Sequence, residues 1–263
     1  MTDTNLGTAK APLGVGEIIS SSFSILFSNF FKVLLLGFVG ALIGLIVNSI
    51  FLGFGAATGT ADPIDLANNF SGVGYVISVL VNMAIYGLVT ALLIQLAYDA
   101  KLGRSNSIGT YFKAALPAII PITLLTVVVT LLMGIGAIAL IIGALWVYAV
   151  FYVMAPVAVI ERGGFGSLGR SAALTKEYRW PIVGLFVVMV IITMLIQFAS
   201  TFVVGLMAAL TASAVGIVIV AIFFALLSAL GYVITGISSA LVYARLREIK
   251  EGVDVDQIAS VFE

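Results

Sequence analysis

The chain has 263 residues, of which 62% are hydrophobic and only 9% are charged, with 12 basic and 12 acidic side chains. A soluble domain carries about a quarter charged residues, so this composition excludes an ordinary soluble enzyme or nucleic-acid-binding protein and indicates a protein that lies in lipid. The sequence has no cysteine and no histidine, which excludes disulfides, thiol or imidazole catalysis and zinc sites of the Cys/His type.

Six apolar segments are long enough to cross a bilayer, which takes about 20 residues of helix. Their apolar runs are continuous rather than alternating, which favours helices over barrel strands. We therefore predict an all-α, polytopic membrane protein, a single integral membrane domain whose six transmembrane helices form three hairpins. The predicted helices are residues 30–54, 72–98, 118–134, 137–160, 181–210 and 214–243. The turn inside the uncharged run 118–160 is expected between 134 and 143, preferably at "MGIGA".

Each hairpin is preceded by a segment with the helical period of an amphipathic surface helix, at residues 13–29, 105–116 and 164–178. A fourth amphipathic segment follows the last hairpin, at residues 244–263. The first three segments each contain an apolar residue followed by glycine, namely Val15-Gly16, Ile108-Gly109 and Phe165-Gly166. We interpret them as an internal repeat of three units. The alternative is that any hairpin protein needs polar inner loops, and that the glycines recur by chance.

The basic residues indicate the orientation of the chain. All of them fall on the side that the six-helix topology gives to the N-terminus: Lys10, Lys32, Lys101, Arg104, Lys113, Arg162, Arg170, Lys176, Arg179, Arg245, Arg247 and Lys250. The opposite loops hold none, and the first of them carries Asp62 and Asp65. Because short loops rich in lysine and arginine stay in the cytoplasm, both termini are expected there. We expect no cleaved signal peptide.

Three stretches resemble known bacterial membrane proteins: "LGVGEIISSSFSILFSNFFKVLLLG", "APVAVIERGGFGSLGRSAALTKEYRW" and "LVYARLREIKEGVDVDQIASVF". They are similar to the membrane domain attached to some glycerophosphoryl diester phosphodiesterases, and equally to stand-alone YciC-type inner-membrane proteins. The resemblance implies a six-helix protein of the bacterial inner (cytoplasmic) membrane. In the phosphodiesterases a soluble catalytic domain follows the membrane part. Residues 1–263 contain no such domain, so the resemblance gives no catalytic residue.

A few polar residues inside the predicted spans are candidates for a binding site. Asn82, Gln95 and Gln197 are amides within apolar segments, and Asn82 is the most central amide of the second span. The functional interpretation is a cavity near the midplane that binds a solute. The structural interpretation is hydrogen bonding between helices, which buried polar side chains in lipid commonly provide.

Two further groups of residues point to contacts. Arg170, Lys176 and Arg179 are predicted to contact anionic lipid headgroups at the cytoplasmic surface. Gly40 and Gly44 form a GxxxG pair, which lets helix backbones approach closely. That approach is expected either within the chain or with another subunit.

No catalytic, phosphate-binding or metal-ligand motif is found in the sequence, so we predict no enzyme, no cofactor and no metal. The favoured function is a non-catalytic inner-membrane protein that acts through contacts, as an accessory subunit or scaffold of a larger membrane-protein complex or as a modulator of membrane organisation. The alternative is a carrier or channel for a lipid-like or small apolar solute. The expected partners are a bilayer with anionic lipids on the cytoplasmic leaflet and that larger complex, not nucleic acid.

Overall fold

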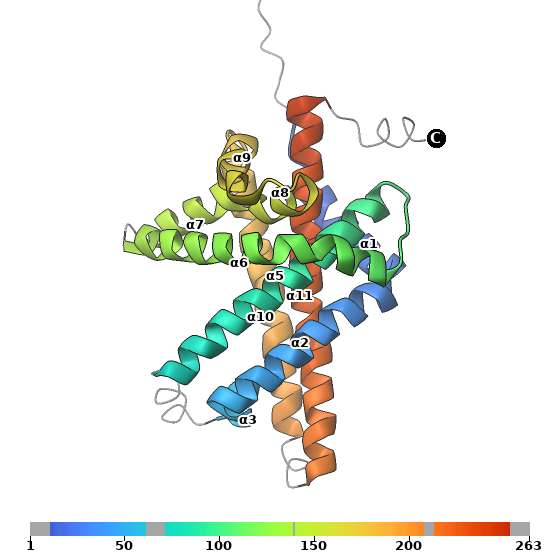
Figure 1. The fold of residues 1–263 in the computed structure, drawn as a ribbon, viewed down its shortest axis with the longest axis vertical. Coiled ribbons are helices and arrows are strands. Elements are labelled where there is room, and N and C mark those ends of the chain that lie inside the picture. Colours follow the sequence, from blue (N-terminus) through green and yellow to red (C-terminus); the bar gives the residue numbers. More distant parts are fainter. Residues whose placement is uncertain (1–10, 62–71, 139, 208–212, 253–263) are drawn as a thin grey trace, which may run out of the picture.

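The computed structural model describes residues 11–61, 72–138, 140–207 and 213–252, and these residues form helices without any strand (Figure 1). Six helical segments are long and apolar enough to cross a membrane, which confirms the all-α, multi-pass membrane architecture. The helices are α1 Val15–Ser28, α2 Phe30–Leu52, α3 Phe54–Thr58, α5 Val73–Lys101, α6 Ile108–Ile138, α7 Leu140–Phe151, α8 Met154–Ile160, η1 Gly164–Gly166, α9 Ser167–Thr175, α10 Arg179–Leu206 and α11 Ala214–Glu251.

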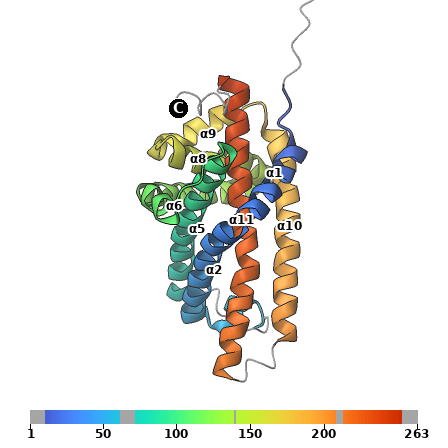
Figure 2. The ribbon, with the colours of Figure 1, turned by 90° about the vertical axis from the view of Figure 1, so that its right-hand side faces the viewer.

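The long helices are not parallel to one another. α11 packs against α2, α5 and α10, while α6 packs against α5 and α7. Figure 1 shows α2 and α5 running diagonally and α6 and α7 lying across the direction of α10 and α11, and Figure 2, turned by 90°, views α6 nearly along its axis. The α2–α5 pair therefore lies between two differently inclined helix pairs.

Glycines let α2 lie close to two neighbours. A Cβ atom on Gly40 would lie 2.2 Å from Val89 Cγ2 on α5, and one on Gly44 would lie 3.0 Å from Asn82 Oδ1 on the same helix. A Cβ atom on Gly37 would lie 2.9 Å from a methyl group of α11. Gly40 and Gly44 thus lie at a helix–helix contact within the chain.

The surface helix predicted at 105–116 is not separate. α6 runs without a break from Ile108 to Ile138, through Pro117 and Pro121. A proline removes one backbone hydrogen bond, but in membrane helices neighbouring groups satisfy the freed carbonyl and the helix continues. The prediction of two segments separated at Pro117 is therefore wrong, and the middle unit of the proposed repeat lacks a surface helix of its own.

The predicted helix 137–160 is interrupted, because α7 ends at Phe151 and α8 begins at Met154. In a continuous helix the carbonyl of Val150 would accept the N–H of Met154. Here it accepts the hydroxyls of Ser171 at 2.9 Å and Thr175 at 3.0 Å, both from α9. These hydroxyls are buried, so α9 turns its Ser171–Thr175 side inward.

The remaining predicted boundaries differ in smaller ways. The "MGIGA" segment is helical, and α6 and α7 approach closely where a Cβ atom on Gly136 would lie 2.9 Å from the backbone of Gly143. α11 continues to Glu251 instead of ending at 243. Residues 62–71 with Asp62 and Asp65, residue 139, the turn at 208–212 and the tail 253–263 lie outside the described residues.

The basic end of the protein is held together by side-chain to backbone hydrogen bonds. The Tyr178 hydroxyl donates to the carbonyl of Ala11 at 3.0 Å, and Arg245 donates to that of Pro12 at 3.3 Å. Lys250 on α11 donates to the carbonyls of Ala173 and Lys176 at 2.9 and 2.8 Å. The N-terminal segment, the α9 region and the end of α11 therefore form one unit beside α1.

Candidate functional site

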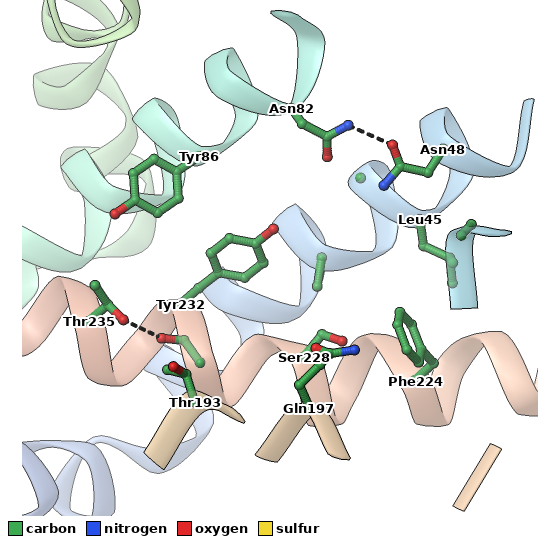
Figure 3. A pocket seen from close by; sticks show the side chains of 14 residues that line it. Leu45, Asn48, Asn82, Tyr86, Thr193, Gln197, Phe224, Ser228, Tyr232 and Thr235 are labelled. Carbon is green, nitrogen blue, oxygen red and sulfur yellow. Dashed lines mark hydrogen bonds between the residues drawn. The ribbon is translucent and has the colours of Figure 1, made fainter. Parts of the chain in front are cut away.

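A cavity of about 440 Å³ lies inside the apolar bundle, between α2, α5, α10 and α11 (Figure 3). Its walls combine small and apolar residues with amides and hydroxyls. The lining residues are Ala41, Gly44, Leu45, Asn48, Ala57, Asn82, Tyr86, Thr193, Gln197, Phe224, Ser228, Gly231, Tyr232 and Thr235. Two of the three predicted amides, Asn82 and Gln197, therefore lie on the wall of one cavity, on α5 and α10 respectively.

An asparagine pair forms one side of the cavity. The Asn82 amide nitrogen donates to Asn48 Oδ1 on α2 at 2.8 Å and to the carbonyl of Ser78 at 2.8 Å, and the Ser78 hydroxyl donates to the same Asn48 oxygen. These bonds use the nitrogen of Asn82 and the oxygen of Asn48. The oxygen of Asn82 and the nitrogen of Asn48 remain, and Figure 3 shows both on the cavity side of the pair.

The opposite side presents further polar groups that have no hydrogen-bond partner in the described part of the chain. The hydroxyl of Ser228 on α11 is buried and makes no hydrogen bond within the described residues. The amide of Gln197 on α10 likewise has no hydrogen bond in this part of the chain, and the residue is exposed. In Figure 3 the hydroxyl of Tyr232 points from α11 toward the asparagine side. An unpaired polar group in lipid costs free energy, so these groups favour a polar occupant.

The described lining of the cavity is uncharged, and the end of the cavity nearer α3 is apolar. No aspartate, glutamate, lysine or arginine is among its described lining residues. At the end nearer α3, Phe54 and Ala57 pack on a buried cluster of Leu45, Val204, Val220 and Phe224. The site can therefore accept and donate hydrogen bonds through its amides and hydroxyls.

A smaller cavity of about 130 Å³ adjoins the first, since Tyr86 and Thr235 line both. The ring of Tyr86 lies 6.0 Å from that of Tyr232, between centroids. The smaller cavity contains two more buried hydroxyls without a partner in the described residues, those of Thr126 and Ser239. The polar lining thus extends from the asparagine pair toward α6 and α7.

Gln95 does not lie in this site. It lines a separate cavity of about 200 Å³ with Asp99 and Arg162. The reason is helix geometry: Gln95 follows Asn82 by 13 residues on α5, which is about 20 Å along the axis. The prediction that three amides meet is therefore wrong for Gln95.

The three predicted lipid-contact residues have different surroundings. Arg170 makes a bidentate hydrogen bond with Glu161 at 3.0–3.1 Å and also pairs with Glu251. The hydrogen bond with Glu161 raises the pKa of the Arg170 guanidinium above its ordinary value. Because both partners belong to the chain, Arg170 is an internal ion-pair residue, and its contact with lipid headgroups stays a prediction.

The other two basic residues also differ from each other. The guanidinium of Arg179 lies over the ring of Trp146, 5.3 Å from its centroid, in a cation–π contact. Lys176 is exposed, and its side chain has no ion pair among the described residues. Of the three, Lys176 keeps the geometry expected of a residue that contacts lipid.

Some residues of the site were missed from the sequence, namely the lining residues Tyr86 and Tyr232 and also Ser78, which donates to the lining residue Asn48. A signal for them exists: Ser78, Asn82, Tyr86 and Thr90 recur every four residues on α5, which places them on one helix face. On α11 the polar residues Ser228, Tyr232, Thr235 and Ser239 follow the same helical period. Polar stripes inside apolar helices predict a shared polar interior.

Comparisons with known proteins gave no matching family, no similar curated protein and no similar solved structure.

Proposed function

We propose that the protein binds an uncharged, hydrogen-bonding amphiphile in the cavity between α2, α5, α10 and α11, and carries it within the membrane. The observation that supports this proposal most is a set of polar groups on the cavity wall that have no hydrogen-bond partner among the described residues, above all the Ser228 hydroxyl and the Gln197 amide. Polar groups that serve only to join helices are expected to be paired with one another.

The lining indicates the chemistry of the ligand. Because no charged side chain is among the described residues that line the cavity, an ionic headgroup would lack a partner on these walls, so the ligand is uncharged. The asparagine and glutamine amides both donate and accept, which suits hydroxyl and ester groups. Leu45 and Phe224 offer an apolar surface to a hydrocarbon chain. The volume of about 440 Å³ lies within the roughly 300–1,000 Å³ typical of small-molecule sites.

The position of Gln197 supports entry from the bilayer. Gln197 is exposed on α10, and α10 packs on α11 and α7 rather than on α2 and α5. The side of the cavity between α10 and the α2–α5 pair is therefore the least packed one. An amphiphile is expected to enter there, headgroup first, with its chain toward the lipid.

The proposal is tested with a neutral lipid analogue that carries a photoreactive diazirine on its acyl chain. In the purified protein, crosslinks are expected on peptides of α2, α5, α10 and α11, and Asn82→Leu should reduce them severalfold. Gln95→Leu is the matched control, because it removes an amide from the same helix outside the cavity. Equal labelling of both variants and the unchanged protein would count against a site at Asn82.

Function through protein contacts is the second candidate, as an accessory subunit, scaffold or modulator of membrane organisation. It is favoured by α10, because only 17% of the most apolar 18-residue stretch of this helix is buried inside the protein. Leu195, Phe198 and Phe202 on this helix are 64%, 73% and 58% exposed. Purification from native membranes in mild detergent tests it: a partner in fixed stoichiometry that is lost with Phe198→Ala supports this function, and a lone protein opposes it.

We also propose the bacterial inner membrane as the location, with both termini in the cytoplasm and with anionic lipids near Lys176. The concentration of basic residues at one end of the helices supports this orientation. The resemblance to YciC-type proteins agrees with it. A non-catalytic role is consistent with a cavity that holds no charged side chain among its described residues.

A further inference from the structure

A second cavity, of about 330 Å³, lies at the basic end of the protein, between α1, the end of α5 and α11. It shares no lining residue with the cavity of the proposed function. Its described walls combine four apolar residues, four charged residues and two serines. The lining residues are Leu13, Glu17, Ile18, Ser21, Ser24, Ile25, Lys101, Leu241, Arg245 and Glu248.

The charges around this cavity are balanced but incompletely paired. Arg245 binds Glu248 through Nη1 at 2.7 Å and the carbonyl of Pro12 through Nη2 at 3.3 Å. Its Nε–H is buried and has no partner in the described residues. Within the same part of the chain, no ion pair or hydrogen bond is found for the side chains of Glu17 and Lys101. One carboxylate, one ammonium and one guanidinium N–H are therefore left for a ligand.

α1 carries the features of a helix at the lipid surface. Ile18 and Leu26 are buried against the bundle, whereas Ser20, Ser21 and Ser24 are exposed. At the junction with α2, Phe27 and Phe31 are 68% and 84% exposed, and exposed aromatic side chains beside a polar helix face favour insertion among lipids. The cavity beside α1 is therefore expected at the depth of lipid headgroups.

We infer that this cavity binds the phosphoethanolamine headgroup of a phospholipid. The phosphate accepts from the Lys101 ammonium and the Arg245 Nε–H, and the headgroup ammonium donates to the Glu17 carboxylate, in charge-assisted hydrogen bonds. The hydroxyls of Ser21 and Ser24 flank these groups, and Ile18, Ile25 and Leu241 contact the start of the acyl chains.

The arrangement discriminates against other common headgroups. A phosphocholine group has no N–H to donate, so Glu17 would lose its hydrogen bond. A phosphoglycerol group carries a net negative charge, which Glu17 and Glu248 oppose. The site thus binds both the phosphate and the ammonium of one zwitterionic headgroup. Lys176, in contrast, is expected only to attract anionic lipid.

Native mass spectrometry of the full chain in detergent tests this inference, with phosphatidylethanolamine, phosphatidylcholine and phosphatidylglycerol of identical acyl chains. The unchanged protein should bind the ethanolamine lipid about tenfold more tightly than the other two, as expected for one hydrogen bond to a charged group. Glu17→Gln should remove this preference, and Lys101→Gln should weaken all three lipids. Lys113→Gln removes an exposed lysine outside the cavity and should change nothing.

Ile25→Trp is an independent variant that fills the apolar half of the cavity and should weaken all three lipids without removing a charge. Equal affinities for the three lipids in the unchanged protein would overturn the inference, as would a preference that survives both Glu17→Gln and Ile25→Trp. Soluble phosphoethanolamine should not displace the bound lipid at equal concentration. Displacement would mean that the free compound is the ligand. None of these results depends on Asn82, so failure here leaves the proposed function standing.

Discussion

The Asn82 side chain on α5 donates a hydrogen bond of 2.8 Å to Asn48 Oδ1 on α2. This bond joins two neighbouring helices and also fixes which atoms face the cavity, because it consumes the nitrogen of one amide and the oxygen of the other. Gly44 allows the approach, since a Cβ atom there would lie 3.0 Å from Asn82 Oδ1. The same residue pair therefore serves packing and the candidate site.

Because Asn48 and Asn82 share one hydrogen bond, their replacements should not be additive. Asn82→Leu and Asn48→Leu should each lower the free energy of unfolding in detergent by about 0.6–1.7 kcal/mol. The double variant should cost little more than either single one, as a double-mutant cycle on an interacting pair predicts. Fully additive losses in urea or thermal unfolding would show that the pair contributes no shared energy.

The close contact of α2 with α5 predicts a steric effect at Gly40. Gly40→Ala should destabilise the protein by about 1–3 kcal/mol, because its Cβ atom would lie 2.2 Å from Val89 Cγ2 and valine has one strongly preferred rotamer in a helix. Val89→Ala should partly rescue this variant. Gly184→Ala is the control: no atom lies within 4 Å of its Cβ position, so its stability should stay the same or rise. Thermal unfolding in detergent measures the stability of the unchanged protein, Gly40→Ala, the Gly40→Ala/Val89→Ala double variant and Gly184→Ala.

Arg170 and Lys176 should give different phenotypes, although Arg170 lies on α9 and Lys176 directly follows this helix. Arg170→Gln breaks the pairs with Glu161 and Glu251 and should loosen residues 164–178 in every lipid, by about 1 kcal/mol for partly exposed pairs. Lys176→Gln should change hydrogen exchange of this segment only in nanodiscs that contain anionic lipid. The opposite pattern would mean that Arg170 is the lipid contact after all.

The absence of cysteine from the sequence makes single-cysteine labelling a clean test of orientation. Thr60→Cys lies on the side opposite the basic end, and Lys176→Cys lies at that end, both at exposed positions. In intact spheroplasts a membrane-impermeant maleimide should label the first variant but not the second. Lys176→Cys should react only after permeabilisation, and labelling in the reverse order would contradict termini in the cytoplasm.

The six long apolar helices could be predicted from the sequence, because a long apolar segment in lipid satisfies its backbone hydrogen bonds by forming a helix. The interruptions were harder, since they depend on contacts between distant segments. The boundary predicted between residues 116 and 118 does not occur, because α6 continues through Pro117, whereas the break after Phe151 lacks an obvious local signal. It depends on Ser171 and Thr175, about twenty residues later, whose hydroxyls satisfy the carbonyl of Val150.

The candidate site could be predicted only in part. Asn82 and Gln197 stand out because amides are rare in apolar segments, but their meeting depends on the packing of α10 beside α11. Gln95 was wrongly assigned to this site because its amide was considered without its distance from Asn82 along the axis of α5. The four-residue spacing from Ser78 to Thr90 would have identified the correct face of α5.

The most direct test of the central proposal is the lipid content of the purified protein. Unchanged protein, Asn82→Leu and Gln95→Leu are purified from native membranes in a mild detergent, and their bound lipids are extracted and identified by mass spectrometry. We expect one uncharged lipid with hydroxyl or ester groups in near-stoichiometric amount in the unchanged protein and in Gln95→Leu, and its loss in Asn82→Leu. The same lipids in all three preparations, or only charged lipids, would contradict the proposal that this cavity is a binding site.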